Sequence, residues 1–176
     1  MGKTRSVKET MRTVVCDAGP VIHLQEAGLL YLLPGCGTLS VPALVQEEIR
    51  ANSSAEFIWP HWINVIRLDA QALQHANFLS RSSDLHGGES EAFVLCETLK
   101  ADWLLTDDAA ARLFAATLGM EVHGSLGVVL WNVAHHHLNQ EQGLSALTAL
   151  SKTSLWLSTR TLADAHAAII EICTAP

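Results

Sequence analysis

Six acidic residues in this chain stand where a short apolar run stops or where a helix should begin. They are Asp17, Glu48, Glu89, Glu91, Asp107 and Asp108. Two carboxylates about 4 Å apart repel each other by roughly 4 kcal/mol at an effective dielectric constant of about 20, so a cluster of them needs either protonation or a bound cation. Hard carboxylate oxygens favour Mg²⁺ or Mn²⁺. The pattern therefore predicts a divalent metal site.

Two of these positions follow runs short enough to be fully buried parallel strands. Asp17 follows residues 13–16, and Asp107 with Asp108 follows residues 103–106. Ligands of open α/β sheets bind at the carboxyl ends of the strands, so acids at several strand ends would share one crevice. Each acid alone could be only a helix cap. Acids at four separate strand-to-helix junctions favour a shared metal site.

The apolar pattern around these acids predicts alternating strands and helices. The expected strands are 13–16, 38–41, 63–68, 103–106 and 121–123; the expected helices are 21–33, 42–51, 69–79, 89–100, 109–118 and 126–138. Such alternation implies a parallel sheet with helices on both faces. Beyond residue 139 we expect two more helices, 141–151 and 162–172, around a short strand at 155–158.

The composition indicates one domain and argues against several classes of protein. The chain has 176 residues, of which 49% are hydrophobic, which suffices for one substantial core. A net charge of −7 argues against a broad basic surface for duplex nucleic acid. With no long apolar stretch and no apolar signal core, we expect no membrane association. The four cysteines lack CxxC spacing and suit buried thiols in a reducing cytoplasm.

Five short segments resemble, in their order and spacing, the elements of one known family. Residues 15–22 (VCDAGPVI) resemble the opening strand of the PIN-domain nuclease family, and residues 41–49 (VPALVQEEI) resemble its helix that carries the second acid. Residues 88–92 (GESEA) resemble its GExEA element, residues 104–108 (LLTDD) its TxD element, and residues 124–127 (GSLG) a Gly-Thr-Leu-Gly turn. The subgroup that these segments resemble is that of VapC-type toxins of prokaryotic toxin–antitoxin pairs.

The resemblance implies roles for individual residues. The implied catalytic set is Asp17, Glu48, Glu89 and Asp108. The implied metal ligands are Asp17, Glu48, Glu89, Glu91, Asp107 and Asp108, with Asp108 favoured over its neighbour Asp107. The hydroxyl of Ser125 would position a phosphate or a water molecule. Arg112 lies one helical turn past Asp108, from which it could reach a phosphate.

The resemblance also implies a fold and an activity. The fold would be a three-layer α/β/α domain with a central, mostly parallel sheet, forming a single PIN-like domain over residues 1–176 with a core at about 13–138 and a helical extension at about 139–176. The activity would be that of a Mg²⁺- or Mn²⁺-dependent endoribonuclease that cleaves single-stranded RNA and leaves a 5′-phosphate. A toxin of this kind is restrained by an antitoxin protein. The apolar outer helices are compatible with a homodimer.

Two other functions compete with this hypothesis. A further acid often follows the TxD aspartate in the family, whereas here Ala109, Ala110 and Ala111 follow Asp108; a catalytically weak or silent module that binds RNA or protein is therefore an alternative. A phosphoacceptor or small-molecule-binding α/β domain ranks third, because all four lysines lie outside the acidic junctions.

Two further motifs invite a functional interpretation. Residues 135–137 are three histidines, but consecutive helical residues point about 100° apart and cannot all face one ion; a solvated helix end is expected. Among the tryptophans, Trp59 and Trp62 are the better candidates for stacking on a base or contacting a partner. Trp103 and Trp131 are expected in the core or at an interface.

Overall fold

A five-stranded parallel sheet forms the centre of the computed structural model, which describes residues 11–52, 57–83 and 85–174. Its strands are β1 (Thr13–Cys16), β2 (Thr38–Pro42), β3 (Asn64–Ile66), β4 (Trp103–Leu105) and β5 (Val122–His123). They pair in the order β3-β2-β1-β4-β5. Every adjacent pair is parallel, and Val15 of β1 lies opposite Ser40 of β2 and Leu104 of β4.

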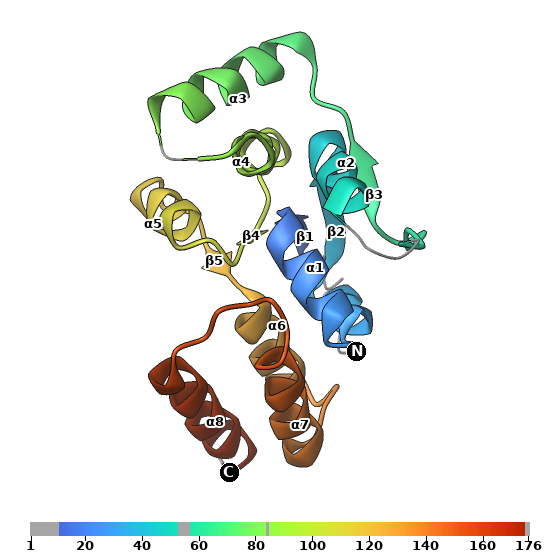
Figure 1. Ribbon diagram of the computed structural model, residues 1–176, viewed down its shortest axis with the longest axis vertical. Coiled ribbons are helices and arrows are strands. Elements are labelled where there is room, and N and C mark those ends of the chain that lie inside the picture. The colour runs from blue at the N-terminus through green and yellow to red at the C-terminus, as the bar shows by residue number, and fades with distance from the viewer. Residues whose placement is uncertain (1–10, 53–56, 84, 175–176) are drawn as a thin grey trace, which may run out of the picture.

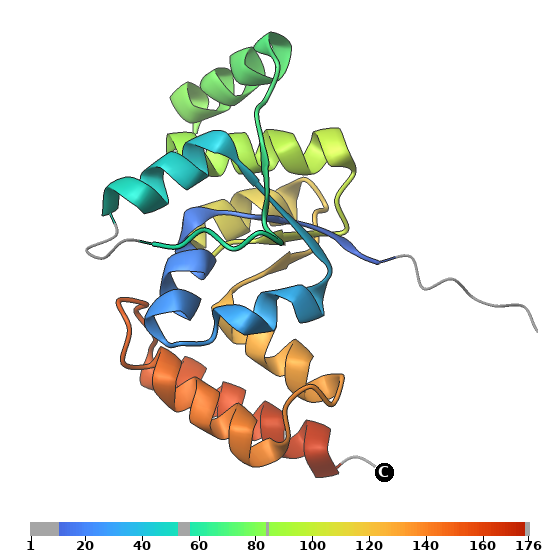
Figure 2. The same ribbon diagram turned by 90° about the vertical axis from the view of Figure 1, so that its right-hand side faces the viewer.

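Helices connect the strands and continue past the last of them (Figures 1 and 2). They are α1 (Ala18–Glu26), the 3₁₀ helix η1 (Leu30–Cys36), α2 (Ala43–Asn52), α3 (Ala70–Ser82), α4 (Gly87–Leu99), α5 (Ala109–Thr117), α6 (Ser125–Ala134), α7 (Gln140–Leu150) and α8 (Thr159–Thr174). Among the described residues, no helix has both the length and the apolar character that crossing a bilayer demands.

The central strands are buried on both faces, which is why their sequences are continuous apolar runs. Val14 and Cys16 of β1 pack with α1, α6, α7 and α8 in one hydrophobic cluster. Val15, between them, packs with α4 and α5 in a second cluster on the opposite face. Figure 2 shows α3 and α4 on one side of the sheet and α6, α7 and α8 on the other. The expected three-layer α/β/α fold is therefore confirmed.

The strand order places a crevice between β1 and β4. From β1 the chain continues to β2 and β3 on one side of the sheet, and it then crosses back to form β4 and β5 on the other side. The connections that leave β1 and β4 therefore diverge at the carboxyl ends of these two strands. Ligands of doubly wound sheets bind at such a switch point.

Several predicted boundaries differ from the structure. The first helix begins at Ala18, directly after its capping residue Asp17, and it stops at a left-handed Gly28 with φ of 70°. Residues 30–36 then form the 3₁₀ helix instead of continuing the α-helix. Pro42 ends strand β2 rather than starting the next helix. Helix α4 begins at Gly87, two residues before the expected start.

The prediction of a strand at residues 155–158 was wrong. These residues form no regular element in the structure and pair with no strand in the described part of the chain. Leu155 and Leu157 are half-buried while Trp156 between them is exposed. The alternation of apolar and exposed side chains at residues 155–157 therefore belongs to a connection in which two leucines are half-buried, and it does not indicate a paired strand.

The histidines and three of the four cysteines singled out above lie as expected. Cys16, Cys36 and Cys96 are buried free thiols, whereas the expectation of burial was wrong for Cys173, which is exposed near the end of α8. Burial raises the pKa of the Cys36 thiol to about 12, so it stays protonated at neutral pH. The three histidines at 135–137 are exposed after the end of α6.

Candidate active site

Asp17 occupies the centre of the crevice, at the carboxyl end of β1. Its backbone N–H donates to the carbonyl of Leu105, 2.9 Å away, which places it beside the end of β4. Its carboxylate accepts the Ala18 N–H at 2.6 Å and the Thr106 hydroxyl at 3.1 Å. Only 6% of Asp17 is exposed. The aspartate is therefore held rigidly by both strands.

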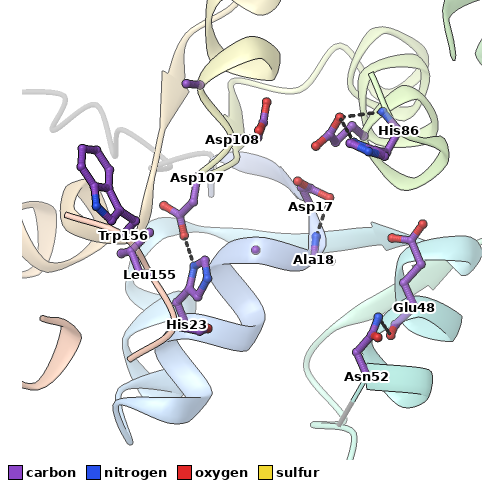
Figure 3. Close-up of a pocket in the computed structure, with 14 residues that line it drawn as sticks. Asp17, Ala18, His23, Glu48, Asn52, His86, Asp107, Asp108, Leu155 and Trp156 are labelled. Atoms are coloured by element: carbon purple, nitrogen blue, oxygen red, sulfur yellow. Dashed lines mark hydrogen bonds and ion pairs between the residues drawn. The ribbon is translucent and has the colours of Figure 1, made fainter. Parts of the chain in front are cut away.

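Five of the six predicted acids line one cavity of about 610 Å³ around Asp17. They are Asp17, Glu48, Glu89, Asp107 and Asp108. They reach it from four places in the fold, namely the junction of β1 with α1, helix α2, the first turn of α4, and the segment between β4 and α5. Figure 3 shows Asp17, Glu48, Asp107 and Asp108 around this cavity. The fold thus brings together acids that are up to 91 positions apart, from Asp17 to Asp108.

Burial and mutual repulsion make the charged form of Asp17 unfavourable. Its pKa is raised from 3.8 to about 6, chiefly because burial removes water from the carboxylate and secondarily because the charges of Glu89 and Glu48 repel it. The hydrogen bonds from Ala18 and Thr106 offset part of this rise. A site whose acids raise one another's pKa attracts a cation.

Glu48 and Glu89 meet at the start of α4. The Gly88 N–H donates to Glu48 Oε1 at 3.2 Å, and a Cβ atom built on Gly88 would overlap the Glu48 carboxylate. Burial, and then the charge of Glu89, raises the pKa of Glu48. Glu89 accepts the backbone N–H of His86 at 2.8 Å, which caps the helix. The glycine therefore lets the second acid dock on the helix N-terminus.

Asp107 is fastened on the opposite side of the cavity by three hydrogen bonds. Its Oδ2 lies 2.7 Å from His23 Nδ1 and accepts the Ser125 hydroxyl at 2.6 Å. Its Oδ1 accepts the Ser125 N–H at 2.7 Å. The close approach also depends on Gly124, where a Cβ atom would lie 2.6 Å from Asp107 Oδ1. Ser125, completely buried, thus contacts Asp107 instead of opening into the cavity.

Asp108 differs from its neighbour in being exposed at the cavity edge. It is the N-cap of α5, and its Oδ1 accepts the Ala111 N–H at 2.7 Å. The Thr106 hydroxyl accepts the Asp108 N–H at 3.3 Å while donating to Asp17. Thr106 therefore links the two aspartates.

Besides Ser125, two of the predicted residues lie away from this cavity. Glu91 lines a separate cavity of about 180 Å³ with Glu47 and Arg67. It follows Glu89 by two residues on α4, so its side chain points about 200° around the helix axis from that of Glu89. Burial, and then the charges of Glu48 and Glu47, raises the pKa of Glu91. Arg112 lines a neighbouring cavity of about 330 Å³ that it shares with Asp107.

Comparison with known families decides what kind of domain this is. A family model described as a PIN domain matches residues 13–171, which include every strand and all five acids of the cavity. The chain belongs to the PIN-domain family. No curated protein matches it. PIN domains are generally nucleases and usually use divalent metals.

The acids of this PIN domain have the chemistry that a divalent cation requires. All five offer oxygen atoms, the ligands that Mg²⁺ and Mn²⁺ prefer, and Asp17 and Glu48 have raised pKa values. Across residues 11–52, 57–83 and 85–174, however, no three His, Cys, Asp or Glu side chains form a group that could hold a metal ion as they stand. Each acid is instead turned to a hydrogen-bond donor of its own. The set fits a cation if Glu48, Glu89 and Asp108 turn inward towards the fixed carboxylate of Asp17.

The cavity of the PIN domain also includes residues that the sequence did not single out. His23 lines it one helical turn after Gly19, and Thr106 bonds to Asp17 behind it. His23 lies on the helix that begins directly after Asp17, and this nearness to a predicted site residue could have identified the histidine. Trp156 lines the cavity too, and no local signal linked it to Asp17, which is far away in the sequence.

Proposed function

We propose that this PIN domain is a divalent-metal-dependent endoribonuclease that cleaves single-stranded RNA. The observation that carries the proposal is the set of five carboxylates around one cavity at the ends of β1 and β4. Gathering these acids has an energetic cost, since burial and mutual repulsion raise the pKa of Asp17 and Glu48. A cation would offset that cost. Mg²⁺ and Mn²⁺ are the cofactors that the oxygen ligands favour.

Asp17, Glu48, Glu89 and Asp108 are the residues that would hold the cation. When bound, a divalent cation acidifies water and offsets the negative charge that develops at phosphorus. Asp17 contributes a fixed carboxylate, since Ala18 and Thr106 hold both of its oxygens. Asp107 keeps His23 and Ser125 in place, and it would serve as a ligand only by giving up one of these bonds.

The toxin role is the finer part of the proposal. The GExEA element at residues 88–92 and the order of the other motifs support the VapC-like subgroup, in which an antitoxin protein restrains the nuclease. Coexpression with the product of an adjacent gene for a small DNA-binding protein should then relieve growth arrest caused by this chain. Continued arrest with a stably bound partner would contradict the toxin role.

The nuclease proposal is tested by incubating labelled single-stranded RNA with the purified protein in Mn²⁺, Mg²⁺ or EDTA. We expect cleavage with either metal and none with EDTA. Asp17→Asn and Asp108→Asn should each lower the rate by about 100-fold or more, because each removes a charge from the site. Undiminished cleavage by both variants would contradict the proposal.

Asp69→Asn is the matched control for Asp108→Asn. Asp69 is also a helix N-cap, with its Oδ1 accepting the Ala72 N–H at 2.8 Å, but it lies outside the acidic cavity. Asparagine is as good an N-cap as aspartate, so both helices should persist. Loss of cleavage in Asp108→Asn alone would assign the effect to the site.

A silent RNA- or protein-binding module is the second candidate. It is favoured by Ala110 and Ala111, which stand two and three residues after Asp108, where the family often carries a further acid. Calorimetric titration with Mn²⁺ separates the two functions. Micromolar binding without cleavage of any RNA would favour the silent module, whereas binding with cleavage would exclude it.

A further inference from the structure

Trp156 is the one tryptophan of five whose side chain is exposed, and all five lie in the described residues. It is 84% exposed, although it is the side chain with the largest apolar surface to lose from water. Trp103 is buried, while Trp59, Trp62 and Trp131 are half-buried and pack against the core. A single exposed apolar side chain is normal on a protein surface, so the inference depends on where this indole lies.

The position of Trp156 is the second observation. It lines both the acidic cavity and the neighbouring cavity that contains Arg112. Figure 3 shows it on the side of the acidic cavity where Asp107 and His23 lie. A molecule that extends from one cavity to the other would therefore pass the indole.

The connection between α7 and α8 holds Trp156 in this place. Glu26 of α1 accepts the Ser154 N–H at 2.7 Å and the Ser154 hydroxyl at 2.8 Å. Leu155 packs against the main core cluster. On the other side, the Ser158 hydroxyl accepts the Thr161 N–H at 3.0 Å at the start of α8. The segment that carries the indole is therefore held in place by contacts on both sides of Trp156.

Arg112 supplies a positive charge at the same cavity. It is exposed on α5, and a Cβ atom built on Gly124 would lie 3.0 Å from its guanidinium nitrogen. It forms no ion pair with any residue in the part of the chain that the structure describes. A guanidinium without an acidic partner is available to a phosphate.

We infer that Trp156 and Arg112 form a nucleotide subsite next to the acidic cavity, in which Trp156 stacks on one unpaired base and Arg112 binds a phosphate. This inference deepens the proposed function and rests on it. Stacking on an aromatic ring needs an unpaired base but no particular sequence. The subsite therefore favours single strands over duplexes. Since Leu155 and Leu157 are half-buried, the exposed apolar surface is one ring rather than the broad patch that a protein partner prefers.

The test measures the affinity of a short labelled single-stranded RNA by fluorescence anisotropy, in EDTA and separately in Ca²⁺. Trp156→Ala should weaken binding about tenfold or more, whereas Trp156→Phe, which keeps an aromatic ring, should retain most of the affinity. Phe78→Ala is the matched control, because Phe78 is an aromatic residue, 66% exposed, that lines neither cavity. It should bind like the unmodified protein.

Oligonucleotides with a single abasic nucleotide separate the two contacts. The loss caused by Trp156→Ala should disappear when the base at one position is missing, whereas the loss caused by Arg112→Gln should persist, because the phosphate remains. Arg112→Gln should also lower the dependence of affinity on salt. Together these results would place one base and one phosphate in the subsite.

Binding without turnover makes this test independent of the nuclease assay. Base-dependent binding with no cleavage would support the subsite and contradict only the nuclease. Unchanged affinity in Trp156→Ala, or no binding of RNA in either buffer, would overturn the subsite. So would a Trp156→Ala variant that binds RNA normally but no longer binds a purified antitoxin, since the indole would then belong to a protein interface.

Discussion

At the scale of single residues, the acidic cavity depends on carboxylates that the fold places at an energetic disadvantage. Asp17 is the most buried of them, with 6% exposed, and it keeps its charge at neutral pH only against burial and the repulsion of Glu89 and Glu48. Function and stability therefore oppose each other at this position.

The stability of the metal-free protein should depend on the ionisation of Asp17. Its pKa is about 6 in the folded protein, against an ordinary value of 3.8. Between these pH values the folded state binds more protons than the unfolded state, so the free energy of unfolding should fall as the pH rises, and stay low above about 6. In EDTA, Asp17→Asn should exceed the unmodified protein in stability by roughly 1–3 kcal/mol at about pH 8.

Urea unfolding between about pH 4 and pH 8 measures this effect. The advantage of Asp17→Asn should shrink towards pH 4, where the carboxyl is protonated in the folded protein and close to its titration midpoint in the unfolded chain. Asp69 is an exposed cap away from the cavity, so Asp69→Asn measures how replacing a carboxylate with an amide at a helix cap changes the free energy of unfolding. An advantage of Asp17→Asn that is equal at every pH would show that its carboxyl does not cause the difference.

Gly88 should be essential for placing Glu48. Gly88→Ala would put a methyl group into the Glu48 carboxylate, which is the movable end of a side chain, so we expect the protein to fold but Glu48 to leave its place. Cleavage should fall about tenfold. Gly87→Ala is the matched control, since its Cβ atom would meet only Leu44 Cδ2, 3.1 Å away. Equal rates in the two variants would contradict the role given to Gly88.

At the scale of elements, the ends of helices and strands do most of the positioning. Asp17 and Asp108 cap α1 and α5, and Glu89 closes the first turn of α4, so the structural and the proposed functional roles coincide in the same residues. The connection between α7 and α8 adds Trp156 through a bond to α1. The site is therefore built from residues at the ends of elements in four separate parts of the chain.

The tether between Glu26 and Ser154 should control the order of that connection. Glu26→Ala removes the acceptor of the Ser154 N–H and hydroxyl, so hydrogen exchange of the Ser154 amide should accelerate about five- to tenfold. Exchange measured by NMR provides the check. Glu171→Ala, on the exposed side of α8, should leave it unchanged. Unaltered exchange in Glu26→Ala would mean that Leu155 alone fixes the segment.

At the scale of the whole molecule, the last two helices share a core with the sheet. Leu147 of α7 and Ile169 of α8 are completely buried and belong to the same cluster as Val14 of β1. Gly143 lets α7 approach α6, since a Cβ atom there would lie 2.6 Å from Val133 Cγ2. We therefore expect α7 and α8 to unfold together with the sheet.

Leu147→Ala tests this cooperativity. It should lower the free energy of unfolding by roughly 2–5 kcal/mol, because it leaves a cavity in the shared core. Unfolding in urea should still be a single transition, with circular dichroism and tryptophan fluorescence coinciding. Leu113→Ala, at a position that is 70% exposed, should have little effect. Two separate transitions would show that the C-terminal helices fold independently.

Local sequence patterns were enough to predict the central strands, their alternation with helices, and the acids at the junctions, since burial on both faces and helix capping are local features. The same patterns wrongly predicted a strand at residues 155–158, because alternation does not reveal whether a partner strand is present. Only the tertiary structure separated Glu91 from Glu89, turned Ser125 and His23 towards Asp107, and brought Trp156 to the cavity. Contacts between residues far apart in the chain decide the strand order, the rotation of each helix and the packing of α7 and α8. A local sequence pattern contains no information about such contacts.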